Sequence, residues 1–395
     1  MSSKVEYIEV DSLGDSPVSP DGLELRQSAD SLQELGSEKT RRMLDKYCAK
    51  IDRRILIYAI VLCVLNQSDR GSIGVAKVVG LEEDLGMANN DFNIAATLFT
   101  VGYLSLEVFS NFILKFVGAS RLLPTLGVLW GLVCALQGVI RTKTQLYVMR
   151  LLLGMAECGF TAGILLILSF FYPKQRLTTR DTKRALFDWQ LWCMTLATFA
   201  TCASSGSVSI FAPEVINELG FSPAQSQAMS ALPSACGAIT ILLSGQIVRV
   251  CRGHWLAGSL SLAVALTGSV IMVSTLSIPL RILGLCLLGA GGFAGLGILP
   301  GWNITANSQT VANSTVASAL TVFMGASSGF VASNVFLNWD APRFVIGHTV
   351  NIAILALGIC ACIVTRINMG RRNRRYKQEG LAGFGNEATS FRYVY

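Results

Sequence analysis

The chain has 395 residues, of which 52% are hydrophobic and only 14% charged, and its mean hydropathy is +0.51. Soluble domains have about 25% charged residues. A soluble domain with this composition could not shield its apolar surface from water, so the composition predicts an all-α polytopic membrane protein. The net charge of +7 does not indicate nucleic-acid binding, because the basic residues lie mainly beside apolar segments, as in loops on the cytosolic side of a membrane.

Ten apolar stretches follow a polar N-terminal segment, residues 1–52, which we expect to be a disordered cytosolic tail. A helix that crosses a bilayer needs about 20 mostly apolar residues, and each stretch qualifies. We expect the first stretch to act as the signal anchor. The stretches lie near residues 54–76, 92–114, 122–140, 146–171, 189–211, 226–248, 255–275, 281–300, 314–336 and 345–366.

The stretches fall into two groups separated by a short polar linker. Residues 53–171 are predicted to form an N-terminal bundle of four spans, 172–188 a cytosolic linker, 189–366 a C-terminal six-helix bundle and 367–395 a cytosolic tail. Basic residues precede the first span and follow the fourth, sixth and tenth, so with ten spans these clusters share one face. The positive-inside rule then places both termini in the cytosol, and we expect residence in the plasma membrane.

The cysteines and histidines give no sign of a metal centre. Most of the 11 cysteines lie inside apolar stretches, where cysteine acts as a small hydrophobic residue. With two histidines in the whole chain, the usual zinc ligand sets cannot be assembled. We therefore expect no metal and no cofactor, and since the motifs of common catalytic sites are also missing, we expect no enzyme.

The most informative residues are ionisable groups inside the apolar stretches. Asp69 and Arg70 lie in the first, Glu107 in the second, and Arg150 and Glu157 in the fourth. A charge at mid-membrane costs at least about 2.5–3.5 kcal/mol, so each needs a partner or a wet cavity. The seven residues from Arg150 to Glu157 are two helical turns, which puts both on one face about 10 Å apart.

These charges allow two interpretations. In the functional one, Arg70 is the fixed cation that attracts an anionic substrate, while Asp69 and Glu157 are carboxylates whose protonation is coupled to transport. In the structural one, Asp69–Arg70 and Arg150–Glu157 are ion pairs that only neutralise one another. For Glu107, near the end of its helix, we favour a charge-pairing role.

Asn303 follows a glycine-rich run from Gly289 to Gly301. We interpret the run mainly as a surface for helix packing. Asn303 is retained as a candidate substrate ligand.

Five motifs carry a resemblance to a known family. They are DRGSIGVAK from Asp69, GLEEDLGMANNDFNIA from Gly80, RLLLGMAECGFTAG from Arg150, FAPEVINELGFSPAQ from Phe211 and DAPRFVIGHTVN from Asp340. Together they resemble the fungal allantoate permease family, the anion:cation symporters of the major facilitator superfamily.

The resemblance implies a major facilitator fold of two six-helix bundles around a central cavity. It also implies transport of a carboxylate such as allantoate, nicotinate, pantothenate or a sugar acid, with protons as the second partner. The family's substrate-binding and proton-coupling roles fall here on Asp69, Arg70, Arg150 and Glu157.

The chain departs from the family pattern in length. YPKQRLTTR, ending at Arg180, is followed almost directly by KRALFDWQLW, which in the family begins the seventh helix. The resemblance thus implies that helices 5 and 6 and the central loop are missing, which leaves about ten spans instead of twelve. A degenerate, non-transporting permease or a nutrient sensor is therefore the alternative to a transporter, and metabolite export the alternative to import. The sequence does not indicate the oligomeric state.

Overall fold

A computed structural model describes residues 57–381, except for 89, 118, 171–186, 308–310 and 342. The chain divides into two compact units, Met1–Leu65 and Asn66–Tyr395. The packing described below lies within the second unit.

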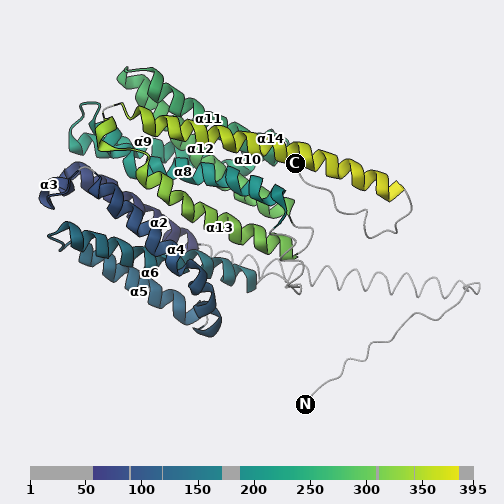
Figure 1. The fold of residues 1–395 in the computed structure, drawn as a ribbon, viewed down its shortest axis with the longest axis horizontal. Coiled ribbons are helices and arrows are strands. Elements are labelled where there is room, and N and C mark those ends of the chain that lie inside the picture. Colours follow the sequence, from purple (N-terminus) through teal and green to yellow (C-terminus); the bar gives the residue numbers. More distant parts are fainter. Residues whose placement is uncertain are drawn as a thin grey trace, which may run out of the picture. The chain divides into compact units, whose positions relative to one another are not determined.

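All regular elements in the described part of the chain are helical, as predicted (Figure 1). The first half contains α2 (Ile57–Ala76), the π-helix η2 (Lys77–Leu81), α3 (Glu82–Asp84), α4 (Asp91–Val117), α5 (Ala119–Gln137) and α6 (Lys143–Phe170). The second half contains α8 (Trp189–Asn217), α9 (Pro223–Leu242), α10 (Ser244–Val250), α11 (His254–Ser274), α12 (Ile278–Ala306), α13 (Val311–Asn334), the 3-10 helix η3 (Asn338–Asp340) and α14 (Val345–Leu381).

Several helices are long and apolar enough to cross a membrane. Among the described residues, five pass this test on their own: α8, α11, α12, Val316–Asn334 of α13 and Val345–Arg374 of α14. The stretch predicted as a span at 226–248 is covered by two helices, α9 and α10, which meet at a bend of 58° and pass the test only together. The chain is an integral membrane protein, and the count of ten spans stays a prediction.

Local sequence signals explain where helices of the second half begin. The Asp188 side chain caps α8 by accepting a hydrogen bond from the backbone N–H of Gln190. At α9, Ser222 and Gln225 form a capping box, and Pro223 occupies the first turn, where its missing N–H costs nothing.

α4 and α6 pack closely because glycines meet at their crossing. A Cβ on Gly154 of α6 would overlap the carbonyl oxygen of Phe99 and lie 2.8 Å from the backbone nitrogen of Tyr103, both on α4. A Cβ on Gly102 would overlap the carbonyl oxygen of Leu151. Close backbone approach through small residues therefore joins these two helices, and α5 packs on the other side of α6 (Figure 1).

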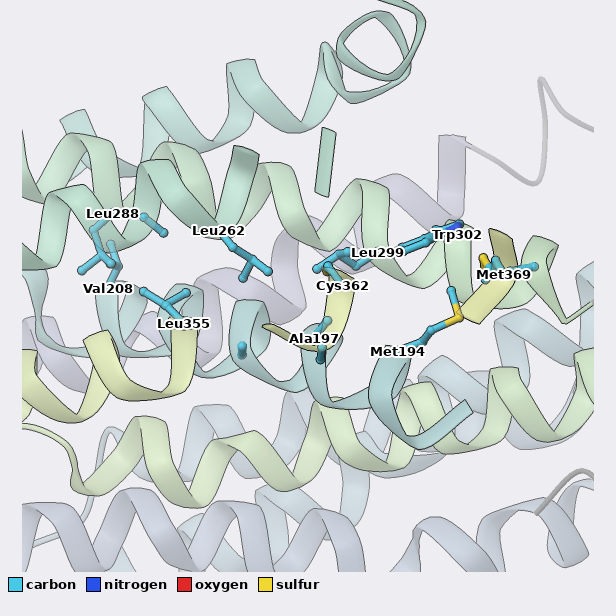
Figure 2. Close-up of a cluster of buried hydrophobic side chains, with 14 of the residues drawn as sticks. Met194, Ala197, Val208, Leu262, Leu288, Leu299, Trp302, Leu355, Cys362 and Met369 are labelled. Carbon is cyan, nitrogen blue, oxygen red and sulfur yellow. The ribbon is translucent and has the colours of Figure 1, made fainter. Parts of the chain in front are cut away.

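The core of the second half is built from α8, α11, α12 and α14 (Figure 2). Small alanines on α8 alternate with large side chains from the other helices. The buried cluster comprises Met194, Ala197, Ala200, Val208, Ala212, Leu262, Ala265, Leu288, Leu299, Trp302, Ala306, Leu355, Ala361, Cys362 and Met369. This core fixes α8, which faces the first half of the chain.

A second buried cluster joins side chains from both halves, and we call it the shared cluster. It comprises Ile73, Phe92, Ala95, Leu146, Phe211, Val215, Ile216, Met272, Leu285, Val335, Phe336 and Phe344. Its aromatic rings meet edge to face, with centroids 5.9 Å apart for Phe92–Phe211 and 5.3 Å for Phe211–Phe336. The two halves are therefore sealed together at the end of the helices where α2 passes into η2.

The last helix is longer than predicted. Sequence patterning places the end of the last span near residue 366, whereas α14 continues to Leu381. On this extension Arg372 forms an ion pair with Asp188, with Nη1 and Oδ2 3.1 Å apart. The first basic residues after the predicted span therefore lie on a continuation of α14, and Arg372 holds the start of α8 through its ion pair with Asp188.

Candidate substrate site

Arg70 lies on α2 where this helix faces three others. Its guanidinium stacks on two rings of α4, 5.2 Å from the Phe99 centroid and 5.1 Å from that of Tyr103. Cys202 of α8 has Arg70 as its main electrostatic neighbour, so the second half of the chain also approaches the cation. The Arg70 side chain is 32% exposed.

Glu157 of α6 is the carboxylate partner of Arg70. The Arg70 Nη2 and Glu157 Oε2 atoms are 3.3 Å apart, and the Glu157 side chain is fully buried. Its other oxygen accepts a hydrogen bond from the Asn66 side chain, one turn before Arg70 on α2. One arginine and one amide thus hold a carboxylate that would otherwise be a costly isolated charge.

Asp69 turns away from Arg70 toward α5. Its Oδ2 accepts a hydrogen bond from Trp130 Nε1 at 2.9 Å and one from the Cys134 thiol at 3.2 Å. Arg150 of α6 is 5% exposed, and its strongest electrostatic interaction is with Asp69. Asp69 and Arg150 therefore form a second charge group, on the α5 side of α2.

The structure brings the four predicted residues together but pairs them differently. Among the described residues, no ion pair within 4.0 Å joins Asp69 to Arg70 or Arg150 to Glu157. The two pairs of the structural interpretation are therefore not direct contacts, and for Asp69 and Arg70 the reason is that adjacent residues on α2 point about 100° apart around the helix axis. The direct pair is Arg70–Glu157.

If Arg70 binds a transported anion, Trp130→Phe should weaken uptake of that anion by freeing Asp69. The change keeps a ring in the buried position and removes a hydrogen bond to a carboxylate, which contributes about 1.5–3 kcal/mol. The freed Asp69 would compete with an anion for Arg70, so the KM of uptake should rise about tenfold or more. Uptake kinetics measure this, with Trp189→Phe, at the half-exposed start of α8, as a matched control. An unchanged KM would show that Trp130 does not hold Asp69.

Glu107 lies one turn beyond Tyr103 on α4 and is 7% exposed. Its electrostatic neighbour is Arg70. The predicted charge-pairing role is compatible with this arrangement and stays a prediction.

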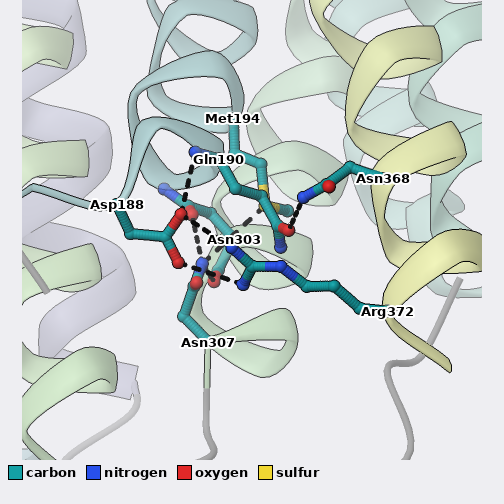
Figure 3. Close-up of polar contacts among 7 residues, drawn as sticks. All are labelled: Asp188, Gln190, Met194, Asn303, Asn307, Asn368 and Arg372. Atoms are coloured by element: carbon teal, nitrogen blue, oxygen red, sulfur yellow. Dashed lines mark hydrogen bonds and ion pairs between the residues drawn. The ribbon is translucent and has the colours of Figure 1, made fainter. Parts of the chain in front are cut away.

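Asn303 lies away from Arg70, in a polar cluster of the second half (Figure 3). The topology predicted from the sequence puts this end of the helices on the cytosolic side. Its Nδ2 donates to Thr321 Oγ1 at 2.9 Å and to Thr195 Oγ1 at 3.3 Å, and its Oδ1 accepts from Asn307 at 2.9 Å. The side chain is fully buried. In this conformation its hydrogen bonds are made within the protein, so a role as substrate ligand stays a prediction.

The two possible roles of Asn303 make opposite predictions for Asn303→Leu. Loss of the amide leaves buried partners unsatisfied, at about 1–3 kcal/mol for each group, so we expect a clear fall in the melting temperature of the purified protein. Asn334→Leu is the control, because it removes a side-chain amide at an exposed position of a membrane-spanning helix, α13. Normal thermal stability together with a raised KM would instead favour the substrate-ligand role.

Sequence reasoning missed Lys77, a buried cation on the same helical face as Arg70. Its Nζ lies 2.6 Å from Glu214 Oε1 of α8, 3.7 Å from Glu82 Oε1 and 2.8 Å from Asn338 Oδ1. The signal was available, because Lys77 follows Arg70 by seven residues, or two helical turns. It was passed over because it lies at the end of the apolar stretch, where a lysine is commonly interfacial.

Comparisons with known proteins agree with this architecture. Residues 59–180 match the family model described as Major Facilitator Superfamily. A bacterial homolog of the human lysosomal transporter Spinster, solved in an inward-facing and occupied conformation, aligns with a TM-score of 0.51 at 11% identity, over 80% of this chain and 97% of that one. The chain has a major facilitator fold. The predicted fold class is thus confirmed.

Relatives named as transporters support the same superfamily. A protein of Agrobacterium vitis named for tartrate transport is 40% identical over 138 residues, which are 35% of this chain and 30% of that protein. The MFS transporter prlL of a fungal species is 24% identical over 440 aligned positions, covering 85% of this chain and 88% of that protein. The chain thus spans less than a third of the length of the tartrate-transporter relatives that it matches.

Proposed function

We propose that this protein is a secondary active transporter of a small organic anion. The observation that carries the proposal is Arg70, whose side chain is 32% exposed and whose guanidinium lies over two aromatic rings and pairs with a fully buried glutamate. A fixed cation in a low-dielectric site attracts a carboxylate strongly and can make charge-assisted hydrogen bonds to it. Relatives named for tartrate transport support the anionic substrate class.

The same geometry supports coupling to protons. An anion that binds Arg70 competes with Glu157 for the guanidinium, and a buried Glu157 without its counter-charge is costly. Protonation of Glu157 removes that cost and releases Arg70 to the substrate. Linkage then requires that anion and proton promote each other's binding equally. Asp69, held by Trp130 and Cys134, is the second candidate for proton coupling.

Transport would proceed by alternating access of the two halves around Arg70. The shared cluster closes one end of the helices, and the positive-inside rule makes this the outer end, with both termini cytosolic. We further propose that the protein resides in the plasma membrane. The five motifs around Asp69, Gly80, Arg150, Phe211 and Asp340 favour the allantoate permease family. The protein would thus carry a carboxylate without a cofactor and without enzymatic activity.

A specific observation favours the alternative of a non-transporting permease or nutrient sensor. The alignment with prlL runs over 440 positions yet includes 85% of these 395 residues, so about a hundred positions of the relative have no counterpart here. The superfamily match ends at residue 180, where the resemblance implies loss of helices 5 and 6. A cavity without these helices could bind an anion and fail to move it.

One experiment separates the two. The full chain is reconstituted in liposomes with an imposed proton gradient, and uptake of labelled tartrate, nicotinate and allantoate is measured. Uptake that depends on Arg70 and collapses with the gradient supports the symporter. Anion binding without uptake favours the sensor, and neither binding nor uptake would contradict both.

A further inference from the structure

Lys77 and Arg70 form two similar sites, two turns apart on one helical face. Each cation lies over aromatic rings and is paired with a carboxylate from another helix, fully buried for Glu157 and 12% exposed for Glu214. Lys77 Nζ lies 4.6 Å from the Phe92 ring centroid and 5.8 Å from that of Phe211. Its partner Glu214 belongs to α8, in the other half of the chain.

The Lys77 ion pair links the two halves of the chain two helical turns from Arg70. It joins η2 to α8, and Asn338 of η3 extends it to the loop before α14. The Lys77 side chain is 6% and that of Glu214 12% exposed. The rings of Phe92 and Phe211 that surround the ammonium belong to the shared cluster, so separating Lys77 from Glu214 also loosens the seal between the halves.

We propose that Lys77 is a second, outer binding site for the transported carboxylate, which opens this end of the protein by replacing Glu214 on the ammonium. The inference rests on the proposed anion transport and adds a first binding step to it. A carboxylate ligand makes the same charge-assisted hydrogen bond to Nζ that Glu214 makes now. Glu214 is thus an internal mimic of the substrate, and its release removes the ionic contact between η2 and α8.

This mechanism gives the anion a means of opening its own path. A ligand can shift a conformational equilibrium only by its differential affinity for the two states. The Lys77 ammonium is occupied by Glu214 in the closed state and available in the open one, so a carboxylate binds the open state better. Once the halves separate, Arg70 lies two turns, or about 10 Å, further along the same face.

The test measures opening directly through a thiol between the two cations. Ile73 lies on the same face of α2, is 2% exposed and belongs to the shared cluster. The full chain carrying Ile73→Cys is purified in detergent and treated with a maleimide, and mass spectrometry of the peptide with position 73 gives the labelling rate. The probes are tartrate, nicotinate and allantoate, with neutral threitol as control.

We expect a carboxylate probe to accelerate labelling by at least about fivefold, the lower end of usual site-to-site coupling. Glu214→Gln should make labelling fast without any probe. Lys77→Met should also label fast but with no response to the probes, while Lys77→Arg should keep the response. Melting temperatures check the fold, and Val215→Cys on α8 repeats the series if Ile73→Cys does not fold.

Three results would overturn the inference: no acceleration by any carboxylate, equal acceleration in Lys77→Met, or loss of acceleration in Arg70→Ala. The last would assign the effect to the inner site. Failure of the proposed transport is distinguishable, because it appears as missing uptake in liposomes, whereas the labelling rate reports opening at Lys77 whether or not the cycle is completed.

Discussion

Replacing Arg70 by alanine should abolish anion uptake, with a fall of about 30-fold or more. Removing one member of a hydrogen-bonded charge pair costs about 2–5 kcal/mol, much of it from the charge left behind. Here that charge is Glu157, which is fully buried and would keep only its hydrogen bond from Asn66. The initial rate of uptake in liposomes measures the effect.

A double variant separates binding from folding in this experiment. Arg70→Ala alone should also lower the melting temperature, because it strands a buried carboxylate. Adding Glu157→Gln removes the stranded charge and should restore the melting temperature without restoring uptake. Arg70→Lys should recover uptake only in part, since lysine keeps the charge but not the planar fork or its ring stacking. Wild-type uptake in the double variant would show that Arg70 does not bind the transported anion.

Much of the site was predictable, because a charge inside an apolar stretch is conspicuous in sequence. Asp69, Arg70, Arg150 and Glu157 were identified in this way, and the structure brings them together. Their pairing was not predictable, since it depends on which helices surround α2. The hydrogen bonds from Trp130 and Cys134 turn Asp69 toward α5, and no periodicity within α2 reveals this.

A close backbone contact between the halves also escaped sequence reasoning. Gly71 and Gly74 on α2 resemble many other small residues in this chain, which has 37 glycines. What distinguishes them is the partner. A Cβ on Gly71 would lie 3.3 Å from the carbonyl oxygen of Ser209 on α8, a contact between residues far apart in sequence that composition does not encode.

Gly74→Ala should block transport by holding α2 and α8 apart. A Cβ at this position would overlap the carbonyl oxygen of Ile210 and lie 2.8 Å from its carbonyl carbon. Both are backbone atoms, so no rotation of a flexible side chain can relieve the clash. Overpacking of this kind costs about 1–3 kcal/mol, and here the cost falls on the closed state alone, because the contact is between the two halves.

A helix glycine in open surroundings provides the matched control for Gly74→Ala. A Cβ on Gly131 of α5 would meet no neighbouring atom within 4 Å, so Gly131→Ala should leave uptake intact and, through helix propensity, stabilise by up to about 1 kcal/mol. Gly74→Ala should instead lower uptake and raise the maleimide labelling rate of Ile73→Cys, because the end near Lys77 cannot close. A protein that binds anion at Arg70 but cannot seal this end has no occluded state, and alternating access requires one. Equal uptake in the two glycine variants would mean that the α2–α8 crossing does not tighten during the cycle.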